Sequence, residues 1–280
     1  MTGLLAAGLL APFFFEATPE VRTSYVSLGK LMEDRPMQVT FTRFGYDAGA
    51  FGRFGIRNWD VSSLTDRRRD AHEQAFYHTE LGPTWQYDLP LADGWALKSD
   101  ITRSWTFYRR FNSAHAASNR TYNWYQIDQS LANPYIVPFY RLRKCFRGND
   151  YVYFMAGVRR RLSLRDCGRA GGLPLPERPA GSFWDSLYLT PSVFVYGGSS
   201  RSYRRTFGPR PDGERWSDGV SAITFRFEFG CSFNENFSAF LFVEQYDVVG
   251  QGARHVNAAS TYRCAHNDWT LGGLGLRFKF

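Results

Sequence analysis

The chain has 280 residues, 18% of them aromatic, and its 34 basic and 26 acidic residues give a formal charge of +8. Its mean hydropathy is −0.38, although Phe, Tyr and Trp occur along the whole length. No stretch after residue 17 approaches the ~18 consecutive apolar residues that a membrane-spanning helix needs. If the chain spans a membrane, it must do so with closed strands, because these also satisfy every backbone group in lipid.

The first 17 residues, MTGLLAAGLLAPFFFEA, form an apolar run that resembles the hydrophobic region and cleavage site of a secretory signal. No Lys or Arg precedes Arg22, so the basic start of such a signal is missing, and an apolar first strand is the alternative interpretation. We expect a signal-like segment over 1–17 and a single domain over 18–280. Export argues against nucleic acid as a partner of this basic chain.

Residues 75–107 carry the clearest local pattern. Odd positions from Tyr77 to Leu89 are mostly apolar and even positions from His78 to Asp88 are mostly polar, which is the two-residue period of a strand. Asp93-Gly94 then predicts a hairpin turn. After the turn, the apolar face resumes at Trp95.

The spacing of aromatic residues favours a membrane barrel over a soluble sheet. Trp95 and Trp105 are ten residues apart on one face, and Tyr77 and Tyr87 repeat the interval. Ten residues at ~3.3 Å rise and ~40° tilt cover about 25 Å, the height of the lipid-facing band of such barrels. We interpret these pairs as members of two aromatic girdles.

Similar alternation predicts twelve strands, an even number as in single-chain bacterial barrels. We expect them at 22–32, 37–46, 51–58, 75–89, 95–107, 121–129, 134–143, 151–163, 186–197, 220–230, 236–247 and 268–280. Long polar connections (58–74, 108–120, 198–218 and 248–267) alternate with short turns (47–50, 90–94, 129–133 and 231–236). The connection at 164–185 is too long for a turn. Either this turn is elaborated or the count is wrong by one hairpin.

The last ten residues, LGGLGLRFKF, place Leu274, Leu276, Phe278 and Phe280 on one face and two basic residues on the other. Gly275 followed by the alternating aromatics Phe278 and Phe280 resembles the terminal strand of the outer-membrane protein family. The resemblance implies the outer membrane as location, membrane lipid and lipopolysaccharide as surroundings, and the outer-membrane assembly machinery as a partner.

The expected fold is therefore all-β, a closed antiparallel transmembrane β-barrel of twelve strands. A soluble β-sandwich is the main alternative fold. Strands such as 223–229 argue against it, because they carry three Phe on one face and Arg226 and Glu228 on the other. A charged strand face of this kind must be wet.

Four cysteines suit an oxidising compartment. The expected topology allows Cys145 to pair with Cys264 and Cys167 with Cys231, and four unpaired thiols are the alternative. No Cys or His cluster has the spacing of a metal site, so we expect neither a metal nor a cofactor.

The predicted inward positions are rich in cations, and rings of Arg and Lys favour anions at a constriction. We therefore expect an outer-membrane pore for small, possibly anionic, solutes. The alternative is that the charges pair with each other and fill the interior. The candidate pore-lining or solute-binding residues are Lys98, Arg141, Arg143, Arg159, Arg161, Arg226, Glu228 and Arg277, with Glu80, Asp88, Asp100 and Lys279 as further inward charges.

Two other functions stay open from the sequence. Some outer-membrane barrels are lipid or peptide hydrolases, and His78 with Glu80 is the one His–carboxylate pair predicted inside a strand. We expect no enzyme, because no Gly-x-Ser-x-Gly elbow accompanies this pair and such groups commonly line pores. A structural or adhesive surface protein, acting through loops such as 198–218, is the third possibility.

Overall fold

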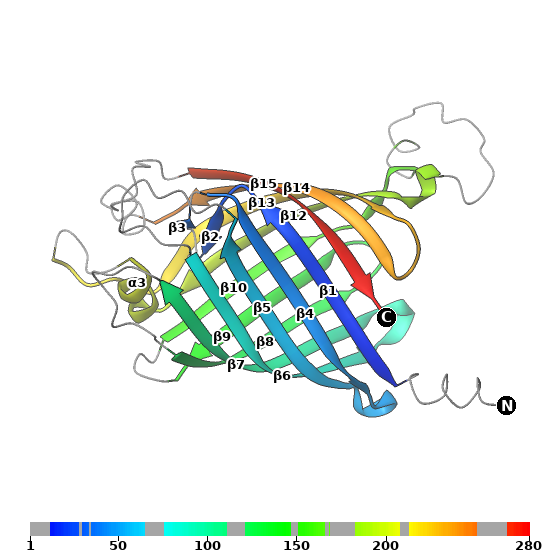
Figure 1. Ribbon diagram of the computed structural model, residues 1–280, viewed down its shortest axis with the longest axis horizontal. Coiled ribbons are helices and arrows are strands. Elements are labelled where there is room, and N and C mark those ends of the chain that lie inside the picture. Colours follow the sequence, from blue (N-terminus) through cyan, green and yellow to red (C-terminus); the bar gives the residue numbers. More distant parts are fainter. Residues whose placement is uncertain are drawn as a thin grey trace.

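The computed structural model describes residues 12–27, 30–33, 35–64, 76–110, 121–146, 151–165, 168, 183–207, 213–250 and 268–280. Within these ranges, twelve strands close into the antiparallel barrel of Figure 1. The barrel strands are β1 (Phe13–Arg22), β4 (Met37–Asp47), β5 (Arg53–Ser63), β6 (Phe76–Pro90), β7 (Ala96–Arg110), β8 (Thr121–Ala132), β9 (Val137–Cys145), β10 (Tyr151–Arg159), β12 (Leu187–Gly198), β13 (Gly219–Ser232), β14 (Phe237–Val248) and β15 (Asp268–Lys279).

Every barrel strand pairs on both edges. Consecutive strands form hairpins, and the pairings of β1 with β15 and of β10 with β12 complete the ring. A short extra strand, β11 (Leu162–Ser163), also pairs with β12, and β2 (Tyr25–Ser27) with β3 (Lys30–Glu33) forms a separate two-stranded sheet. The prediction of a closed twelve-stranded barrel is confirmed, and the β-sandwich alternative is wrong.

The first strand differs from its prediction at 22–32. β1 occupies Phe13–Arg22, because the alternation of outward Phe13 and Phe15 with inward Phe14 and Glu16 begins inside the apolar run. Apolar side chains on both faces hide that alternation in the sequence. Residues 13–17 of the predicted signal-like segment thus lie in β1, whereas residues 1–11 lie outside the described part of the chain.

Two other strands end at different residues from those predicted. β5 continues to Ser63, so the connection expected from residue 58 begins later, and the strand expected at 151–163 ends at Arg159. Both shifts occur where a polar run follows the apolar face, and backbone pairing with the neighbouring strand decides the boundary there.

The connections alternate in length as predicted. Four short turns, at 48–52, 91–95, 133–136 and 233–236, lie at one end of the barrel, which we call the turn end; the opposite end is the loop end. The connection from β10 to β12, which includes β11 and η4 (Phe183–Ser186), is at the turn end. It is an elaborated turn, and the count of twelve stands. The predicted Asp-Gly turn has Asp93 at φ 58° and Gly94 at φ 75°.

The two faces of the wall have opposite chemistry. Outward side chains are apolar and exposed, for example Ile56 (56% exposed), Phe227 (55%) and Leu241 (53%). Inward positions include fully buried polar residues such as Thr102 and Gln126. Apolar residues outside and polar residues inside are the reverse of the arrangement in a soluble protein, and a barrel in lipid requires it.

Aromatic side chains encircle the turn end of the barrel on its outer wall. Phe13 contacts Phe44 and Tyr46, with centroids 6.2 and 5.7 Å apart, and Phe54 stacks on Trp85 at 6.3 Å. On the far side of the β1–β15 seam, Phe237 stacks between Phe233 and Phe278 at 5.0 and 5.1 Å. These rings form the girdle that belongs at a membrane–water interface.

The terminal strand β15 closes the barrel at this girdle. The amide of Phe280 donates to the carbonyl of Phe15, and the Phe15 amide donates back to Phe280, both at 2.8 Å. The terminal pattern seen in the sequence thus lies at the seam between the first and last strands.

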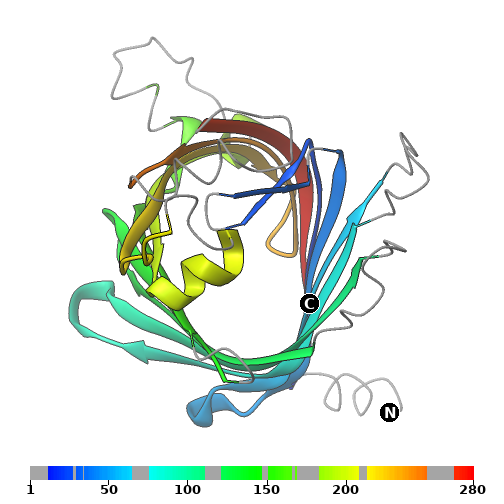
Figure 2. The ribbon, with the colours of Figure 1, turned by 90° about the vertical axis from the view of Figure 1, so that its left-hand side faces the viewer.

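Two elements lie inside the outline of the barrel at the loop end, as Figure 2 shows: helix α3 (Ser200–Phe207) and the β2–β3 hairpin. Tyr25 of β2 is buried against Met37, Val39 and Val61 of the inner wall. These elements narrow the loop-end mouth. No helix in the described ranges is long and apolar enough to span a membrane.

The cost of placing a charge on the outer wall should depend on its depth in the membrane. Phe227 lies five residues from the turn end of β13, near the middle of the lipid-facing band, whereas Phe233 is equally exposed in the turn. We expect Phe227→Arg to lower the free energy of unfolding in lipid vesicles by about 2–4 kcal/mol and Phe233→Arg by about 0–1 kcal/mol. Denaturant titration of the refolded variants checks this, and equal losses would contradict a membrane-embedded wall.

Candidate functional site: the charged inner wall

The inner wall carries two networks of ion pairs on opposite sides of the barrel. The first network consists of three groups of ion pairs on β1 and β4 to β9: Arg43 and Arg53 with Glu16 and Asp100, Arg57 and Arg141 with Asp128, and Arg143 with Glu80. The second joins β1 and β13 to β15 through Glu20, Arg22, Arg226, Glu228, Glu244 and Arg277. Alternation along each strand places all these side chains inside.

Glu80 and Arg143 form the best-matched pair of the first network. Both terminal nitrogens of Arg143 donate to Glu80, at 2.7 and 3.1 Å, and its Nε donates to Gln126 at 2.8 Å. The guanidinium also lies 3.5 Å from the ring centroid of Trp124. Because β6 and β9 are three strands apart, this bidentate pair bridges the curved inner wall.

Two further pairs span the same width of wall. Arg57 of β5 approaches Asp128 of β8 at 3.7 Å, and Arg141 Nε donates to the same carboxylate at 2.5 Å. Arg43 of β4 pairs with Asp100 of β7 and also donates to Glu16 at 2.9 Å. These contacts tie the strands of one side together from within.

The second network is centred on Arg226. Its guanidinium pairs with Glu244 and with Glu228, the latter at 3.1 Å, and stacks 4.0 Å from the centroid of Phe242. Glu228 also accepts two bonds of 2.7 Å from Arg277. The second network therefore balances three arginines with three carboxylates, whereas the first has five arginines and four carboxylates.

The predicted pore-lining residues lie in three different surroundings. Arg141, Arg143, Arg226, Glu228 and Arg277 lie in the networks. Lys98 pairs with Asp88 at 3.1 Å near the turn end, and both side chains are about half exposed. Arg159 and Arg161 are exposed at the turn end, Arg161 beyond the end of β10.

Arg159 and Arg161 differ from the network arginines because neither has a carboxylate partner among the described residues. The Arg159 guanidinium lies 5.5 Å from the ring of Phe139. Arg161 stacks on Tyr188 at 3.7 Å and donates to the Ser232 hydroxyl at 2.7 Å. Both positive charges stay uncompensated at the turn-end mouth.

Sequence reasoning missed much of the network. The missed members are Glu16, Glu20, Arg22, Arg43, Arg53, Arg57, Asp128 and Glu244. Parity along β5 and β8 would have found Arg57 and Asp128. The β1 residues were hidden by the misplaced first strand.

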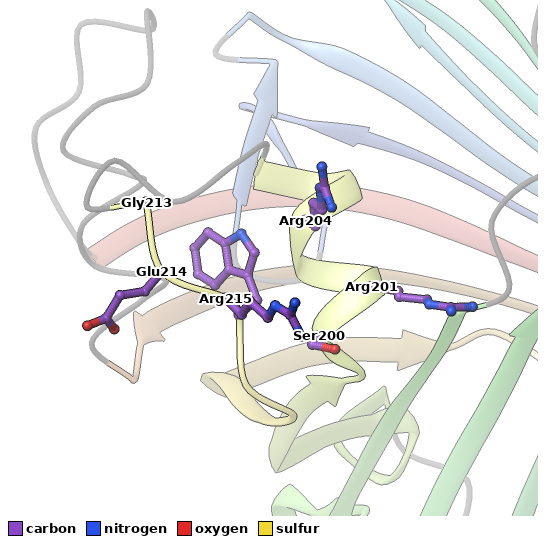
Figure 3. A pocket seen from close by; sticks show the side chains of 7 residues that line it. Ser200, Arg201, Arg204, Gly213, Glu214 and Arg215 are labelled. Carbon is purple, nitrogen blue, oxygen red and sulfur yellow. The ribbon is translucent and has the colours of Figure 1, made fainter.

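A pocket at the loop end presents further arginines (Figure 3). It has a volume of about 430 Å³, and its lining includes Arg201 and Arg204 of α3 together with Glu214, Arg215 and Trp216. Arg201 and Arg204 are exposed and make no ion pair within the described ranges. The lining of this pocket thus has three arginines, Arg201, Arg204 and Arg215, and one acidic residue, Glu214.

Tyr203 fixes α3 to the barrel rim. Its ring packs on Trp216 at 6.0 Å, its hydroxyl donates to the Gly219 carbonyl, and it accepts from the Gly198 amide at 2.9 Å. Burial raises the pKa of this hydroxyl, so it keeps the proton that it donates. The helix is therefore anchored at the adjoining ends of β12 and β13.

The pair considered for catalysis lies inside the barrel. His78 Nε2 is 3.3 Å from Glu80, and both side chains are buried. Glu80 is bound at the same time by Arg143. This setting supports a structural role for the pair in the first network.

Two of the four cysteines, Cys145 and Cys231, lie in the described ranges. Cys145, at the loop end of β9, and Cys231, at the turn end of β13, are too far apart in the barrel to bond to each other. Their predicted partners, Cys264 and Cys167, lie outside the described residues. No group of His, Cys, Asp and Glu in the described ranges could hold a metal ion.

The networks predict unequal costs for removing acidic groups. Glu228→Gln removes the carboxylate that Arg226 and Arg277 share, and it leaves their partly buried charges without this partner. We therefore expect the free energy of unfolding to fall by about 3–5 kcal/mol. Asp88→Asn, in a half-exposed pair, should cost at most about 1 kcal/mol. Urea unfolding in detergent micelles measures both; similar small losses would show that water screens the networks.

Comparison with known proteins supports the fold. No protein-family model matches the chain, and no curated protein matches it by sequence. Among solved structures, an outer membrane channel from Pseudomonas putida F1 is 12% identical, with 96% of this chain and 95% of that chain covered and a TM-score of 0.50. The KdgM porin is 8% identical, covering 95% and 99%, with a TM-score of 0.45.

Barrel enzymes occur among the similar structures as well. The outer membrane phospholipase A from Escherichia coli is 11% identical, covering 97% of this chain and 96% of that chain, with a TM-score of 0.43. Likeness at this level concerns the fold and leaves the activity open. With its closed ring of strands, apolar outer wall and polar inner wall, the chain has the fold of outer-membrane β-barrels.

Proposed function

We propose that this chain forms a narrow outer-membrane channel for small anionic solutes. One observation carries the proposal: apart from Asp47, whose carboxylate accepts from the Gly49 amide, each described acidic residue on the inner face of a barrel strand is paired with a cation. Arg159, Arg161, Arg201 and Arg204, by contrast, have no carboxylate partner in the described ranges. The excess charge of the passage is therefore mainly positive, and most of it lies at the two mouths.

This arrangement suits anion passage physically. Exposed cations at both mouths raise the local concentration of anions, and a middle whose charges are mostly paired avoids a deep trap that would hold them. α3 and the β2–β3 hairpin narrow the loop-end mouth, so selection by size is expected there. The partner is a small anionic solute of the surrounding medium.

Selectivity of the reconstituted protein tests the proposal. In planar bilayers with a salt gradient, the reversal potential should show anion preference. The double variant Arg159→Gln/Arg161→Gln should reduce the anion-to-cation permeability ratio by up to about fivefold, because a charge at ~4 Å in water is worth about 1 kcal/mol.

Lys144→Gln is the matched control, since Lys144 lies on the outer wall beside Phe146 and not in the lumen. It should leave the reversal potential unchanged. Cation preference of the unaltered protein, or an equal effect of the control, would overturn the anion proposal. Absence of conductance would instead favour a barrel-embedded hydrolase or an adhesive surface protein.

The anchoring of α3 gives a second prediction. Tyr203→Ala removes the ring contact with Trp216 and both hydrogen bonds to the rim, so the helix should leave the mouth more often. Single-channel conductance should rise, whereas Tyr203→Phe, which keeps the ring, should produce a smaller rise. Unchanged conductance in both variants would show that α3 does not limit the passage.

A further inference from the structure

The lipid-facing side of β4, β5 and β6 is unexpectedly polar. Thr40, Thr42, Asn58, Asp60 and Thr79 alternate with the inward residues of these strands and therefore face outward. We call these five residues the outer polar patch. Registers place them side by side: Thr40 opposite Asp60, Thr42 opposite Asn58 and Asp60 opposite Thr79.

Four residues of the patch, Thr40, Thr42, Asn58 and Asp60, lie within the depth of the lipid-facing band, whereas Thr79, eleven residues from the turn end of β6, lies at its loop-end edge. Asp60 is seven residues beyond Arg53, the turn-end residue of β5, which at ~3.3 Å rise and ~40° tilt is about 18 Å up a band about 25 Å tall. Asn58 is about 13 Å up, near the middle. Acyl chains offer no hydrogen bonds to these groups, so their exposure to lipid is costly.

The opposite wall is apolar at the depth of Asn58. At similar depth, outward positions of β12 to β14 are Val193, Phe225, Phe227, Leu241 and Val243, all apolar. Nearer the loop end this wall also has outward polar residues, since Thr270 donates to Gln245 and Gln245 donates to Asp247. At the depth of Asn58 and Thr42, the polar residues mark one side of the barrel. A side of this composition is suited to contact with protein rather than with acyl chains.

Hydrogen bonds organise the patch. The Thr79 hydroxyl donates to Asp60 and, at 3.3 Å, to Asn58, and the Asn58 amide donates to Asp60. The carboxylate of Asp60 therefore has a fixed place on the wall. These bonds satisfy the hydroxyl and amide groups within the patch, so Asp60 is the residue of the patch that offers a charge to a partner.

A complementary cation flanks the patch across β6. Arg103 faces outward on β7, seven residues beyond Ala96, the turn-end residue of that strand, and therefore lies at about the depth of Asp60. Its guanidinium rests on the rings of Trp105 and Tyr125, 5.2 and 5.6 Å from their centroids. Since β6 separates the two strands, Asp60 and Arg103 of one chain do not pair.

We propose that β5, β6 and β7 form the interface of a homodimer in the membrane. A two-fold axis along the membrane normal at β6 brings Asp60 of each copy opposite Arg103 of the other, because both residues lie at the same depth on either side of the axis. Leu81, 43% exposed on β6, packs near the axis. The outer polar patches are then covered by protein.

Lipopolysaccharide fits this surface less well than a second copy. Its phosphates and sugars lie at the outer edge of the band, whereas Asn58 and Thr42 lie near the middle, where only acyl chains reach. An anionic lipid would also meet the carboxylate of Asp60. Charge complementarity with both signs on one face favours self-association.

Charge exchange tests the dimer. Sedimentation equilibrium in mild detergent should show a dimer for the unaltered protein. Asp60→Arg and Arg103→Asp should each raise the dissociation constant at least about tenfold, because like charges then meet across the axis. The double variant restores opposite charges and should return to within about threefold of the unaltered protein.

Two controls keep the result interpretable. Gln245→Leu changes a polar residue on the outer wall of β14, far from the interface, and should leave the dimer intact. Heat-modifiable gel mobility verifies that each variant is folded. Thr79→Cys should cross-link between copies in lipid vesicles under oxidation, whereas Thr270→Cys on β15 should not.

The proposal fails if the unaltered protein is monomeric in both detergent and vesicles, or if the double variant is no better than the single ones. It also fails if the variants change only retention of added lipopolysaccharide. None of these outcomes bears on ion selectivity, so the channel and the dimer can be judged separately.

Discussion

Closure of the sheet is the constraint on which the rest of this structure depends. In lipid, a strand edge cannot turn to water for hydrogen bonds, so the backbone of β1 has to find that of β15, and β10 that of β12. The reciprocal bonds between Phe15 and Phe280 complete this pairing at the turn end. Once the ring is closed, alternation along each strand assigns every side chain to lipid or to the interior.

The interior contains many charges, and their arrangement explains how a barrel can carry them. Pairs such as Arg143 with Glu80 span three strands, so they hold the curved wall together while they neutralise it. Removal of charges from bulk water is costly, and bidentate pairing with stacking on Trp124 offsets that cost. Arg159, Arg161, Arg201 and Arg204, which lie outside these pairs, are exposed at the two mouths.

The outer wall is also not uniform in its side chains. Most of it presents Phe, Leu, Val and Ile to lipid, whereas the outer polar patch interrupts this surface on one side. A barrel has no free strand edge through which to associate, so partners must be recognised by side chains on its face. Asp60 and Arg103 provide opposite charges for such recognition without disturbing the ring of strands.

The sequence alone determined the class of fold and most strand positions, because period-two alternation, an Asp-Gly turn and a terminal aromatic strand are local signals. Alternation also identified Arg226, Glu228 and Arg277 as inward residues. It failed at β1, where apolar residues occupy both faces, and it did not reveal which charges meet. Pairing of Arg43 with Asp100 or of Arg57 with Asp128 depends on strands that are distant in sequence and on the curvature of the closed wall. The same holds for the depth that Asp60 and Arg103 share, since only the register of β5, β6 and β7 fixes it.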